Sequence, residues 1–538
     1  MSWNFGDLLD ATARAVPGDR PALIHDRRVT SWRSFDERTN RVARAMRAAG
    51  LEAGDRVAIL ARNIPEFIEI ASAAFKARLT HVNINYRYTS GEIEYVLADC
   101  QAAALFYQVE FAPTVAPLFG RLTHLKLSVS IGGEQTHHGP VYESLAAVGD
   151  GSPLGIERSP DDGFLLYTGG TTGRPKGVMW RGGDARSVQL EAPTIKAVIE
   201  TMEDHVAVVS GNAAPGRVIP ACPLMHGAGL NSSMAELLTG GTVILLPATS
   251  FNAEELWDQA ERHAATRVLI VGDVFARPMV RELYANPARW NLSCMRVISS
   301  SGLMWSDEIK AALVQLIPQI TLVDILGASE ASGLGYAITT QGRATPTGLF
   351  EPGRNTVLIE VDTDRILGPK EVGEGWLART APFAKGYYGD EAKTAATYRR
   401  IGDTRYAIPG DIAARDEHGR IRLIGRGNMC INTGGEKVFP EEVEEELKLL
   451  PGIEDALVIG VPDPVWGKIV AALVRTESGY DEAAARLQLA NTLAAYKIPK
   501  FFFVVDELPR HASGKADYRR ANALVQEKIR ACSSASSA

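Results

Sequence analysis

The chain has no long hydrophobic run. Apolar stretches such as residues 242–246 and 268–271 are far shorter than the roughly 20 residues that a bilayer-spanning helix needs. The N-terminus carries acids at Asp7 and Asp10 and has no basic segment leading into an apolar run, which is unlike a secretory signal. We therefore expect a cytoplasmic protein without a transmembrane segment, whose only contact with a membrane would be peripheral.

Cysteine and concentrated positive charge are also scarce. The five cysteines lack metal-ligand spacing, so we interpret them as buried or idle thiols. They are Cys100, Cys222, Cys294, Cys430 and Cys532. A net charge of -7 with no basic stripe gives no support for nucleic acid as a partner. We expect a small-molecule substrate.

What is present is typical of a folded enzyme with several compact units. The 538 residues are 46% hydrophobic and 22% charged, which is ordinary for globular proteins. Strand-like and helix-like stretches alternate, a pattern that predicts parallel sheets covered by helices, an α/β fold. Strands are expected at 56–60, 242–246, 267–271, 296–299 and 321–326, and helices at 35–49, from Pro65, and at 253–263.

The pattern changes after residues 425–428. An acidic helix is expected at 440–450, strands at 455–461, 469–474 and 501–505, and a helix at 481–496. This order predicts a separate α+β lobe of the size of a small domain.

The segment 165–180 is the most informative part of the chain. An apolar strand leads into three glycines, three threonines and a lysine: Gly169, Gly170, Gly173, Thr168, Thr171, Thr172 and Lys176. The glycines allow backbone N–H groups to approach an anion, and the hydroxyls and the ammonium add donors and charge. We interpret the segment as a phosphate loop, with a surface turn as the alternative. A Walker loop does not fit because Gly177 follows the lysine, which weakens a kinase or P-loop ATPase interpretation.

Two carboxylates stand in suggestive places. Glu330, in the segment 324–333, follows a predicted buried strand, where it could hold Mg2+ on a nucleotide or simply complement a helix N-terminus. Asp411, in the segment 409–412, could accept hydrogen bonds from ribose hydroxyls or belong only to a tight turn.

Three further motifs each have a plain alternative. Lys515 lies on a glycine-containing loop at 508–517 and could be a solvated surface group. His226, in a small-residue turn, could orient an acyl group or be a packed or capping histidine. The run 425–436 has glycines at both ends, which is typical of a hinge followed by a loop that approaches a ligand closely. A plain interdomain linker would explain half of this pattern equally well.

Taken together and in this order, with Gly302, Leu303 and the segment 438–443, these motifs resemble the adenylate-forming superfamily, which contains acyl-CoA synthetases, peptide-synthetase adenylation domains and firefly luciferase. The resemblance extends from about Asp19 to Ala521. It implies an N-terminal region of two layered α/β sheets and a small β-barrel over 1–424, a hinge at 425–428, and a mobile α+β domain over 429–538 that carries a catalytic lysine.

The resemblance also implies a two-step reaction. A carboxylate attacks the α-phosphorus of ATP and expels pyrophosphate, and a thiol then attacks the acyl-adenylate. The implied substrates and cofactors are a small carboxylic acid, ATP, CoA and Mg2+. A homodimer is possible, but the sequence does not decide the oligomeric state.

By similarity, each motif acquires a role. The implied assignments are Thr168 and Glu330 to Mg2+; Thr171, Thr172 and Lys176, with the glycines of the loop, to the β- and γ-phosphates; Gly302, Leu303 and Gly327, with Ala328 and Ser329, to the adenine side of the nucleotide site; Asp411 and Arg426 to the ribose; Lys515 to the substrate carboxylate and α-phosphate; His226 to the acyl group; and Gly434, Gly435 and Glu436 to the thiol channel, with Asn428 as the hinge.

Departures from the common pattern narrow the choice. Asn428, Leu326 and Pro409 stand where a charged hinge, an aromatic residue and a threonine are common, although the main motifs are retained. Asn432 replaces the lysine associated with luciferase-like chemistry, and no carrier-like segment follows Lys515, so CoA is the favoured acceptor. The motifs look closest to the synthetases of fatty acids and carboxylated sterol side chains. A carrier protein or amine as acceptor, an inactive acyl or nucleotide binder, and an ADP-forming phosphotransferase remain as alternatives.

Overall fold

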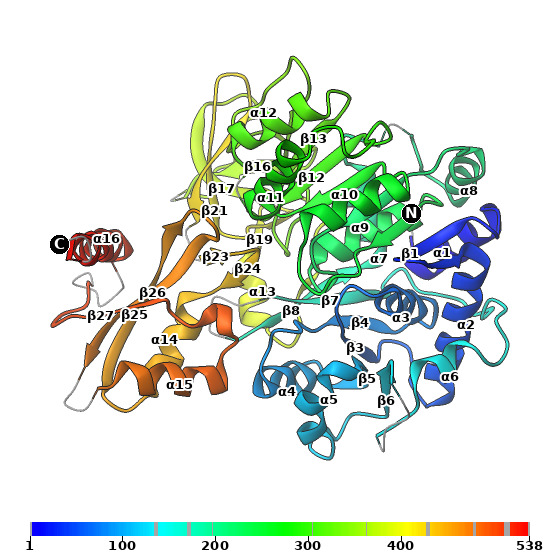
Figure 1. Ribbon diagram of the computed structural model, residues 1–538, viewed down its shortest axis with the longest axis horizontal. Coiled ribbons are helices and arrows are strands. Elements are labelled where there is room, and N and C mark those ends of the chain that lie inside the picture. Colours follow the sequence, from blue (N-terminus) through cyan, green and yellow to red (C-terminus); the bar gives the residue numbers. More distant parts are fainter. Residues whose placement is uncertain are drawn as a thin grey trace. The chain divides into compact units, whose positions relative to one another are not determined.

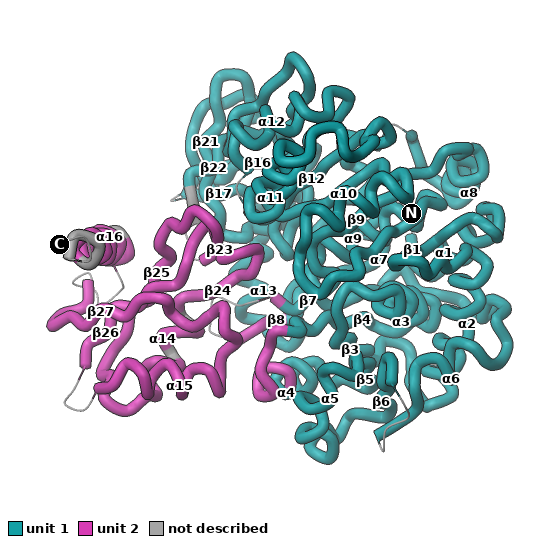
Figure 2. Tube along the Cα trace, viewed as in Figure 1, with its two compact units in different colours: residues 1–86, 94–167, 177–425 teal, residues 87–93, 168–176, 426–538 magenta. Residues whose placement is uncertain are grey.

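The structure, a computed structural model, describes residues 3–133, 138–168, 174–195, 197–303, 305–361, 363–426, 431–476, 480–509 and 517–535. Its contacts divide the chain into two units (Figure 2): residues 1–86, 94–167 and 177–425 form unit 1, and residues 87–93, 168–176 and 426–538 form unit 2.

Unit 1 contains a large mixed sheet (Figure 1). In the described residues its strands are, in order across the sheet, β19 Tyr398–Ile401, β20 Thr404–Ala407, β17 Gly373–Arg379, β21 Asp411–Arg415, β22 Ile421–Arg426, β15 Leu349–Pro352, β14 Gly335–Thr339, β13 Thr321–Leu326, β12 Val297–Ser301, β11 Arg267–Ile270, β9 Arg217–Pro220, β10 Thr242–Leu245, β1 Pro21–His25 and β2 Arg28–Ser31, with β16 Thr356–Ile359 paired to β17. The strands from β13 to β1 are parallel, and β14 begins an antiparallel extension of the sheet.

The second sheet is smaller. Its strands, in order, are β18 Gly386–Tyr387, β8 Lys176–Arg181, β7 Gly163–Thr168, β4 Thr80–Asn83, β3 Arg56–Leu60, β5 Ala102–Gln108 and β6 Leu127–Ile131. The strands from β7 to β6 pair in parallel and are almost wholly buried, because parallel sheets are covered on both faces.

Helices connect and cover these strands. Before Gly425 they are α1 Phe5–Ala15, α2 Trp32–Ala48, α3 Pro65–Lys76, α4 Ser90–Asp99, α5 Ala112–Val115, α6 Tyr142–Ala146, α7 Gly182–Leu190, α8 Met202–Gly211, α9 Gly227–Leu237, α10 Ala253–Arg262, α11 Gly272–Ala285, α12 Asp307–Leu316 and α13 Glu391–Thr397, with short 3-10 helices η1 Val109–Phe111 and η2 Ala116–Leu118. α3 contacts β1 in the large sheet and β3 and β4 in the small one. It therefore lies between the two sheets, and all of its residues are buried.

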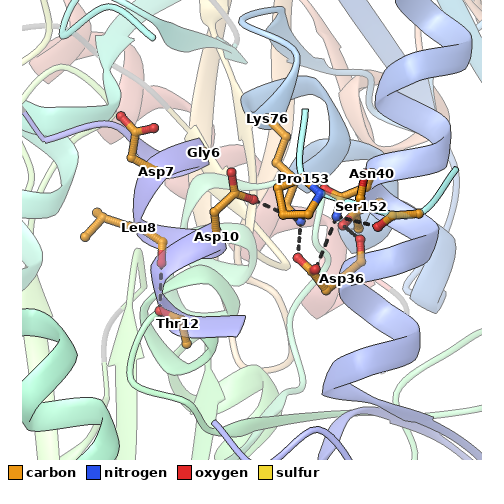
Figure 3. A network of polar contacts seen from close by, with 12 residues as sticks. Gly6, Asp7, Leu8, Asp10, Thr12, Asp36, Asn40, Lys76, Ser152 and Pro153 are labelled. Carbon is orange, nitrogen blue, oxygen red and sulfur yellow. Dashed lines mark hydrogen bonds and ion pairs between the residues drawn. The ribbon is translucent and has the colours of Figure 1, made fainter. Parts of the chain in front are cut away.

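Charged side chains on α3 are tolerated there because they are paired. Lys76, which is 1% exposed, lies 2.5 Å from the Asp36 carboxylate on α2 and 3.3 Å from that of Asp10 on α1, and it donates to Asn40 at 2.9 Å. Figure 3 shows the ammonium between the two carboxylates. A buried cation costs several kcal/mol unless it is compensated in this way, so the network ties three helices together.

Unit 2 is an α+β layer structure. Its described elements are β23 Ile431–Thr433, β24 Glu436–Val438, β25 Ile453–Asp463, β26 Gly467–Thr476, β27 Phe501–Val504, α14 Pro440–Lys448, α15 Glu482–Thr492, η3 Ala495–Lys497 and α16 Tyr518–Ala535. Alternate residues of β25 face different helices: Val458 packs with Leu447 of α14, and Leu457 packs with Val525 of α16. The period-2 alternation of a strand explains why both faces of β25 are apolar.

The expected fold class is confirmed, with small differences at element ends. The α/β region and the smaller C-terminal α+β part are both present. The helix expected at 481–496 ends at Thr492, because Leu493 is extended and packs into the core of unit 2. Among the described residues, no helix is both long and apolar enough to cross a membrane.

Candidate active site

The carboxyl ends of four strands meet at one edge of the large sheet. β9, β11, β12 and β13 are parallel neighbours, so the segments that follow them emerge on the same side. These segments hold most of the sites predicted in unit 1: His226 after β9, Gly302 and Leu303 after β12, and Gly327 to Glu330 after β13. Open α/β sheets bind their ligands at this edge.

Glu330 is held by a tyrosine that the sequence analysis did not single out. The Tyr387 hydroxyl donates a 2.6 Å hydrogen bond to Glu330 Oε1, and Ala384 N donates to the Glu330 carbonyl at 3.2 Å. Tyr387 lies on β18, which pairs with β8, the strand that leaves the phosphate-loop segment. Burial and the Glu330 carboxylate both raise the pKa of Tyr387, so the phenol stays a donor at neutral pH.

The backbone around Glu330 is fixed as well. Ala328 and Ala331 exchange two hydrogen bonds, at 2.9 and 3.2 Å, in a tight turn. The indole of Trp180, on β8, donates to the Ser329 carbonyl at 2.8 Å. Glu330 is therefore a carboxylate with a set orientation, the property that a ligand-binding group needs.

His226 is placed close to the end of β7. It is the residue before α9 and its carbonyl accepts from Leu230 N at 3.2 Å. The Asn83 side chain donates to Met225 O at 2.5 Å and accepts from Tyr167 N at 2.8 Å, which ties this turn to the end of β7. At Gly227 a Cβ would lie 2.9 Å from the end of the Leu166 side chain, so α9 starts in close contact with β7.

Gly302, Leu303 and Asp411 are the remaining candidates for nucleotide binding in unit 1. Gly302 has φ +97, which glycine adopts without strain, and Leu303 packs against the core that lies under β11 and β12. Asp411 is the first residue of β21 and is buried. In the sheet order, β22, β15 and β14 lie between β21 and β13.

Asp324 is a second buried acid on β13 to which the sequence analysis gave no role. Its side chain is buried, which raises its pKa to about 7, although nearby Lys310 favours the ionised form. A perturbed carboxyl near the carboxyl end of a parallel strand is typical of a functional site. The alternation of residues along a strand does not reveal the raised pKa of Asp324, because that shift comes from burial by neighbouring strands.

Several predicted residues lie outside the described ones: Gly169, Gly170, Thr171, Thr172, Gly173, Asn428 and Lys515. Thr168 ends β7 and Lys176 begins β8, and both are grouped with unit 2. Arg426 ends β22. The roles of all of these residues stay predictions.

The predicted thiol-channel loop forms the tight turn between β23 and β24 in unit 2. Gly434 and Gly435 have φ +57 and +90, and a Cβ on Gly434 would lie 2.7 Å from the Trp466 ring. Gly434 N also donates to the Trp466 carbonyl at 2.9 Å. Glu436 is buried and pairs with Arg87. Trp466 itself is 48% exposed, so the loop presents an open aromatic surface.

Within the described residues no group of three or more His, Cys, Asp or Glu side chains could hold a metal ion. Mg2+ needs no such cluster, since it keeps several waters and binds through one or two carboxylates together with substrate phosphates. Glu330, whose Oε1 accepts from Tyr387, fits that requirement.

Comparisons with known proteins agree on one family. The model described as AMP-binding enzyme matches residues 9–388, and the model of the AMP-binding enzyme C-terminal domain matches residues 442–515. The medium-chain acyl-CoA ligase Mig of Mycobacterium avium is 36% identical over 530 residues, which cover 95% of this chain and 96% of the relative.

A second relative, from Mycobacterium tuberculosis, is named medium/long-chain-fatty-acid–CoA/3-oxocholest-4-en-26-oate–CoA ligase. It is 36% identical over 540 residues, covering 98% of this chain and 97% of its own. Among solved structures, the amide bond synthetase McbA from Marinactinospora thermotolerans has a TM-score of 0.80 at 24% identity and covers 96% of this chain and 99% of its own, which shows a shared fold.

Proposed function

The chain belongs to the AMP-binding enzyme family, and from this premise we propose that it is an ATP-dependent acyl-CoA ligase for carboxylic acids of the fatty-acid or sterol side-chain type. The observation that carries the proposal is the end-to-end match, at 36% identity, to relatives named as CoA ligases for such acids. The retained Glu330 and Lys176 argue against an inactive binder.

The reaction has two displacements. An oxygen of the substrate carboxylate attacks the α-phosphorus of ATP; a P–O bond forms, and the bond to the bridging oxygen breaks as pyrophosphate leaves. The CoA sulfur then attacks the acyl carbon, its proton is lost, a C–S bond forms and the C–O bond to AMP breaks. Activation is needed because a free carboxylate is a poor electrophile.

Unit 1 supplies the oriented carboxylate. Glu330, held by Tyr387, would bind Mg2+ together with the Thr168 hydroxyl, and the bound ion would supply positive charge to the leaving pyrophosphate. By the resemblance, Lys176, Thr171 and Thr172 would add donors to the same phosphates. His226, tied to the end of β7 through Asn83, would border the acyl group.

Unit 2 would supply groups for both steps. The Asn432 to Glu436 turn would border the pantetheine arm of CoA, and the exposed Trp466 ring beside Gly434 offers it an apolar wall. Lys515 would bridge the acid and the α-phosphate during the first step. We place the reaction in the cytoplasm, where ATP and CoA are available.

Separating the two steps tests the Lys515 assignment. Lys515→Ala should lower pyrophosphate release from acid and Mg-ATP by about 10² to 10³. The same variant, given the acyl-adenylate and CoA, should still form the thioester. Full pyrophosphate release by this variant would remove Lys515 from the first step.

The acceptor is tested by product analysis. Wild-type enzyme should release pyrophosphate with fatty or sterol side-chain acids and yield a thioester only when CoA is added. Equal product with and without CoA, when an amine or a carrier protein is present, would favour that acceptor, and formation of ADP would favour a phosphotransferase.

A further inference from the structure

Arg186 is buried without a carboxylate partner in the described part of the chain. Its side chain, on α7, is 0% exposed. Nη1 donates weakly to Gln189 Oε1 at 3.4 Å, whereas Nε and Nη2 reach no acceptor among the described residues. Burial lowers the pKa of the guanidinium to about 10, which still leaves it charged at neutral pH. An unpaired buried charge costs several kcal/mol, so this arrangement requires an explanation.

Other buried cations of unit 1 show the usual solution. Arg379, also 0% exposed, lies 2.5 Å from the Glu191 carboxylate and donates to two carbonyls. Lys76 lies between two carboxylates. Arg415, which is 3% exposed, resembles Arg186 in having no ion pair among the described residues, but its Nη1 donates to the Gly368 carbonyl at 2.5 Å. Arg186, whose one hydrogen bond is 3.4 Å long, is therefore the least compensated buried cation in the part of the chain that the structure describes.

A second incomplete polar group lies near Arg186. His205, on α8, is 1% exposed, and its Nε2 is 2.9 Å from Thr12 Oγ1. Because the Thr12 hydroxyl already donates to Leu8 O at 2.8 Å, Nε2 must carry the proton that it shares with Thr12. His205 Nδ1 is then an acceptor that meets no donor among the described residues.

Charge and burial keep that histidine neutral. Burial and the Arg186 charge lower the pKa of His205 to about 4. Helices α7 and α8 both contact α1 (Figure 1), so the two groups lie in the same part of unit 1. Together they offer buried N–H donors from Arg186 and one acceptor from His205.

The position of Arg186 on α7 indicates which end of a substrate it could meet. A Cβ on Gly333 would lie 3.5 Å from Val188 Cγ1, so Val188 faces the segment that carries Glu330. Arg186, two residues earlier on the helix, points to roughly the opposite side. Gln189, which contacts Arg186, donates to Asn231 O on α9 at 3.2 Å. Asn231 lies five residues beyond His226, or ~7.5 Å along a helix.

We propose that Arg186, with His205 beside it, binds an oxygen substituent at the end of the substrate acid that is remote from the reacting carboxylate. The inference rests on the proposed acyl-CoA ligase function and names its substrate class: long acids that carry a hydroxyl, keto or carboxylate group at the far end. Such a group accepts hydrogen bonds from Nε and Nη2, and a hydroxyl also donates to His205 Nδ1.

The test compares three acids of equal length: decanoate, its ω-hydroxy derivative and the corresponding ω-dicarboxylate. For each acid, kcat/KM is measured from pyrophosphate release by wild type, Arg186→Met and Arg186→Lys. Wild type should prefer an oxygenated acid, and Arg186→Met should lower that preference roughly 10- to 100-fold, the value of hydrogen bonds to a charged group. Arg186→Lys should keep part of the preference for the dicarboxylate.

Ser187→Ala is the matched control, because Ser187 is the next residue of α7 and its hydroxyl bonds within the helix to Gly183 O. It should leave the preference unchanged. The Tm of Arg186→Met should not fall, since the variant removes an unpaired buried charge. If Arg186→Met fails to fold, the wild-type selectivity and the shift of wild-type Tm by each acid without ATP decide the question.

The outcomes separate the two proposals. No pyrophosphate with any acid would overturn the acyl-CoA ligase function itself. Turnover of all three acids with equal kcat/KM in wild type would leave that function standing and overturn the role of Arg186, whose partner would then be a buried water or a simple anion. A preference that persists in Arg186→Met would overturn it as well.

Discussion

Replacing Tyr387 by phenylalanine tests whether Glu330 acts through a fixed orientation. The substitution keeps the ring, which is buried between β18 and its neighbours, and removes only the hydroxyl that donates to Glu330 Oε1 at 2.6 Å. A cation bound by Glu330 requires the carboxylate to point in one direction. The variant should therefore hold Mg2+ less firmly on the phosphates of ATP and stabilise the transition state for pyrophosphate release less well.

The size of the effect follows from the bond that is lost. A hydrogen bond to a charged group contributes about 1.5–3 kcal/mol, which corresponds to a roughly 10- to 100-fold lower kcat/KM for pyrophosphate release. The Mg2+ concentration that gives half-maximal activity should rise, whereas the KM for the acid should change little. A purely structural role would not shift the Mg2+ dependence.

Tyr398 provides a matched control. Its ring lies 6.1 Å from that of Tyr387 and is buried, but its hydroxyl has no hydrogen-bond partner in the described residues. Tyr398→Phe should therefore leave kcat/KM and the Mg2+ dependence near wild type. Equal behaviour of the two variants would refute the idea that Tyr387 positions Glu330.

Three further predictions concern stability and the thiol step. Lys76→Met should lower the free energy of unfolding by about 1–3 kcal/mol in urea titrations, because Asp36, which is only partly buried, loses its cation, and buried Asp10 keeps only Arg158; an unchanged value would contradict the role of the network. Burial lowers the pKa of His81 from 6.5 to about 3, so the stability that the protein has above pH 6.5 is lost as the pH falls. His81→Leu should abolish this contribution, which is about 1.4 kcal/mol per pH unit between pH 6.5 and 3. Plots of unfolding free energy against pH that run parallel for wild type and variant would contradict this role of His81. Gly434→Ala brings a Cβ to 2.7 Å from the Trp466 ring at a backbone φ of +57, so it should lower the rate of thioester formation relative to that of pyrophosphate release by roughly tenfold. Gly342→Ala is the control, because Gly342 has φ +83 but its Cβ would meet no atom within 4 Å, and it should leave this ratio unchanged. A similar ratio of the two rates in both variants would exclude the turn at Gly434 from the thiol step.

Local patterns in the sequence predicted much of the fold. The strands at 56–60 and 321–326 and the helix start at Pro65 have the expected bounds, because short apolar runs and a proline at the first helical turn mark them clearly. The helix expected at 481–496 was too long, since Leu493 is extended and packs into the core of unit 2, and a separate 3-10 helix follows at Ala495–Lys497. Periodicity could not anticipate that tertiary packing.

The site was predictable only in part. Glu330 could be placed at the end of a buried strand from sequence, but its partner Tyr387 is 57 positions away, and only the pairing of β18 with β8 brings them together. Asp324 and Arg186 escape sequence analysis for a similar reason: their significance lies in burial, which depends on neighbours far away along the chain. The roles given to Lys515 and to the phosphate loop stay predictions.

The most direct measurement of the central claim follows one atom. An acid labelled with 18O in its carboxylate is incubated with Mg-ATP, CoA and the enzyme, and the products are analysed by mass spectrometry. If the carboxylate attacks the α-phosphorus and the thiol displaces AMP, one labelled oxygen appears in AMP and the acid appears as its CoA thioester. Unlabelled AMP, or ADP with labelled phosphate, would contradict adenylate formation.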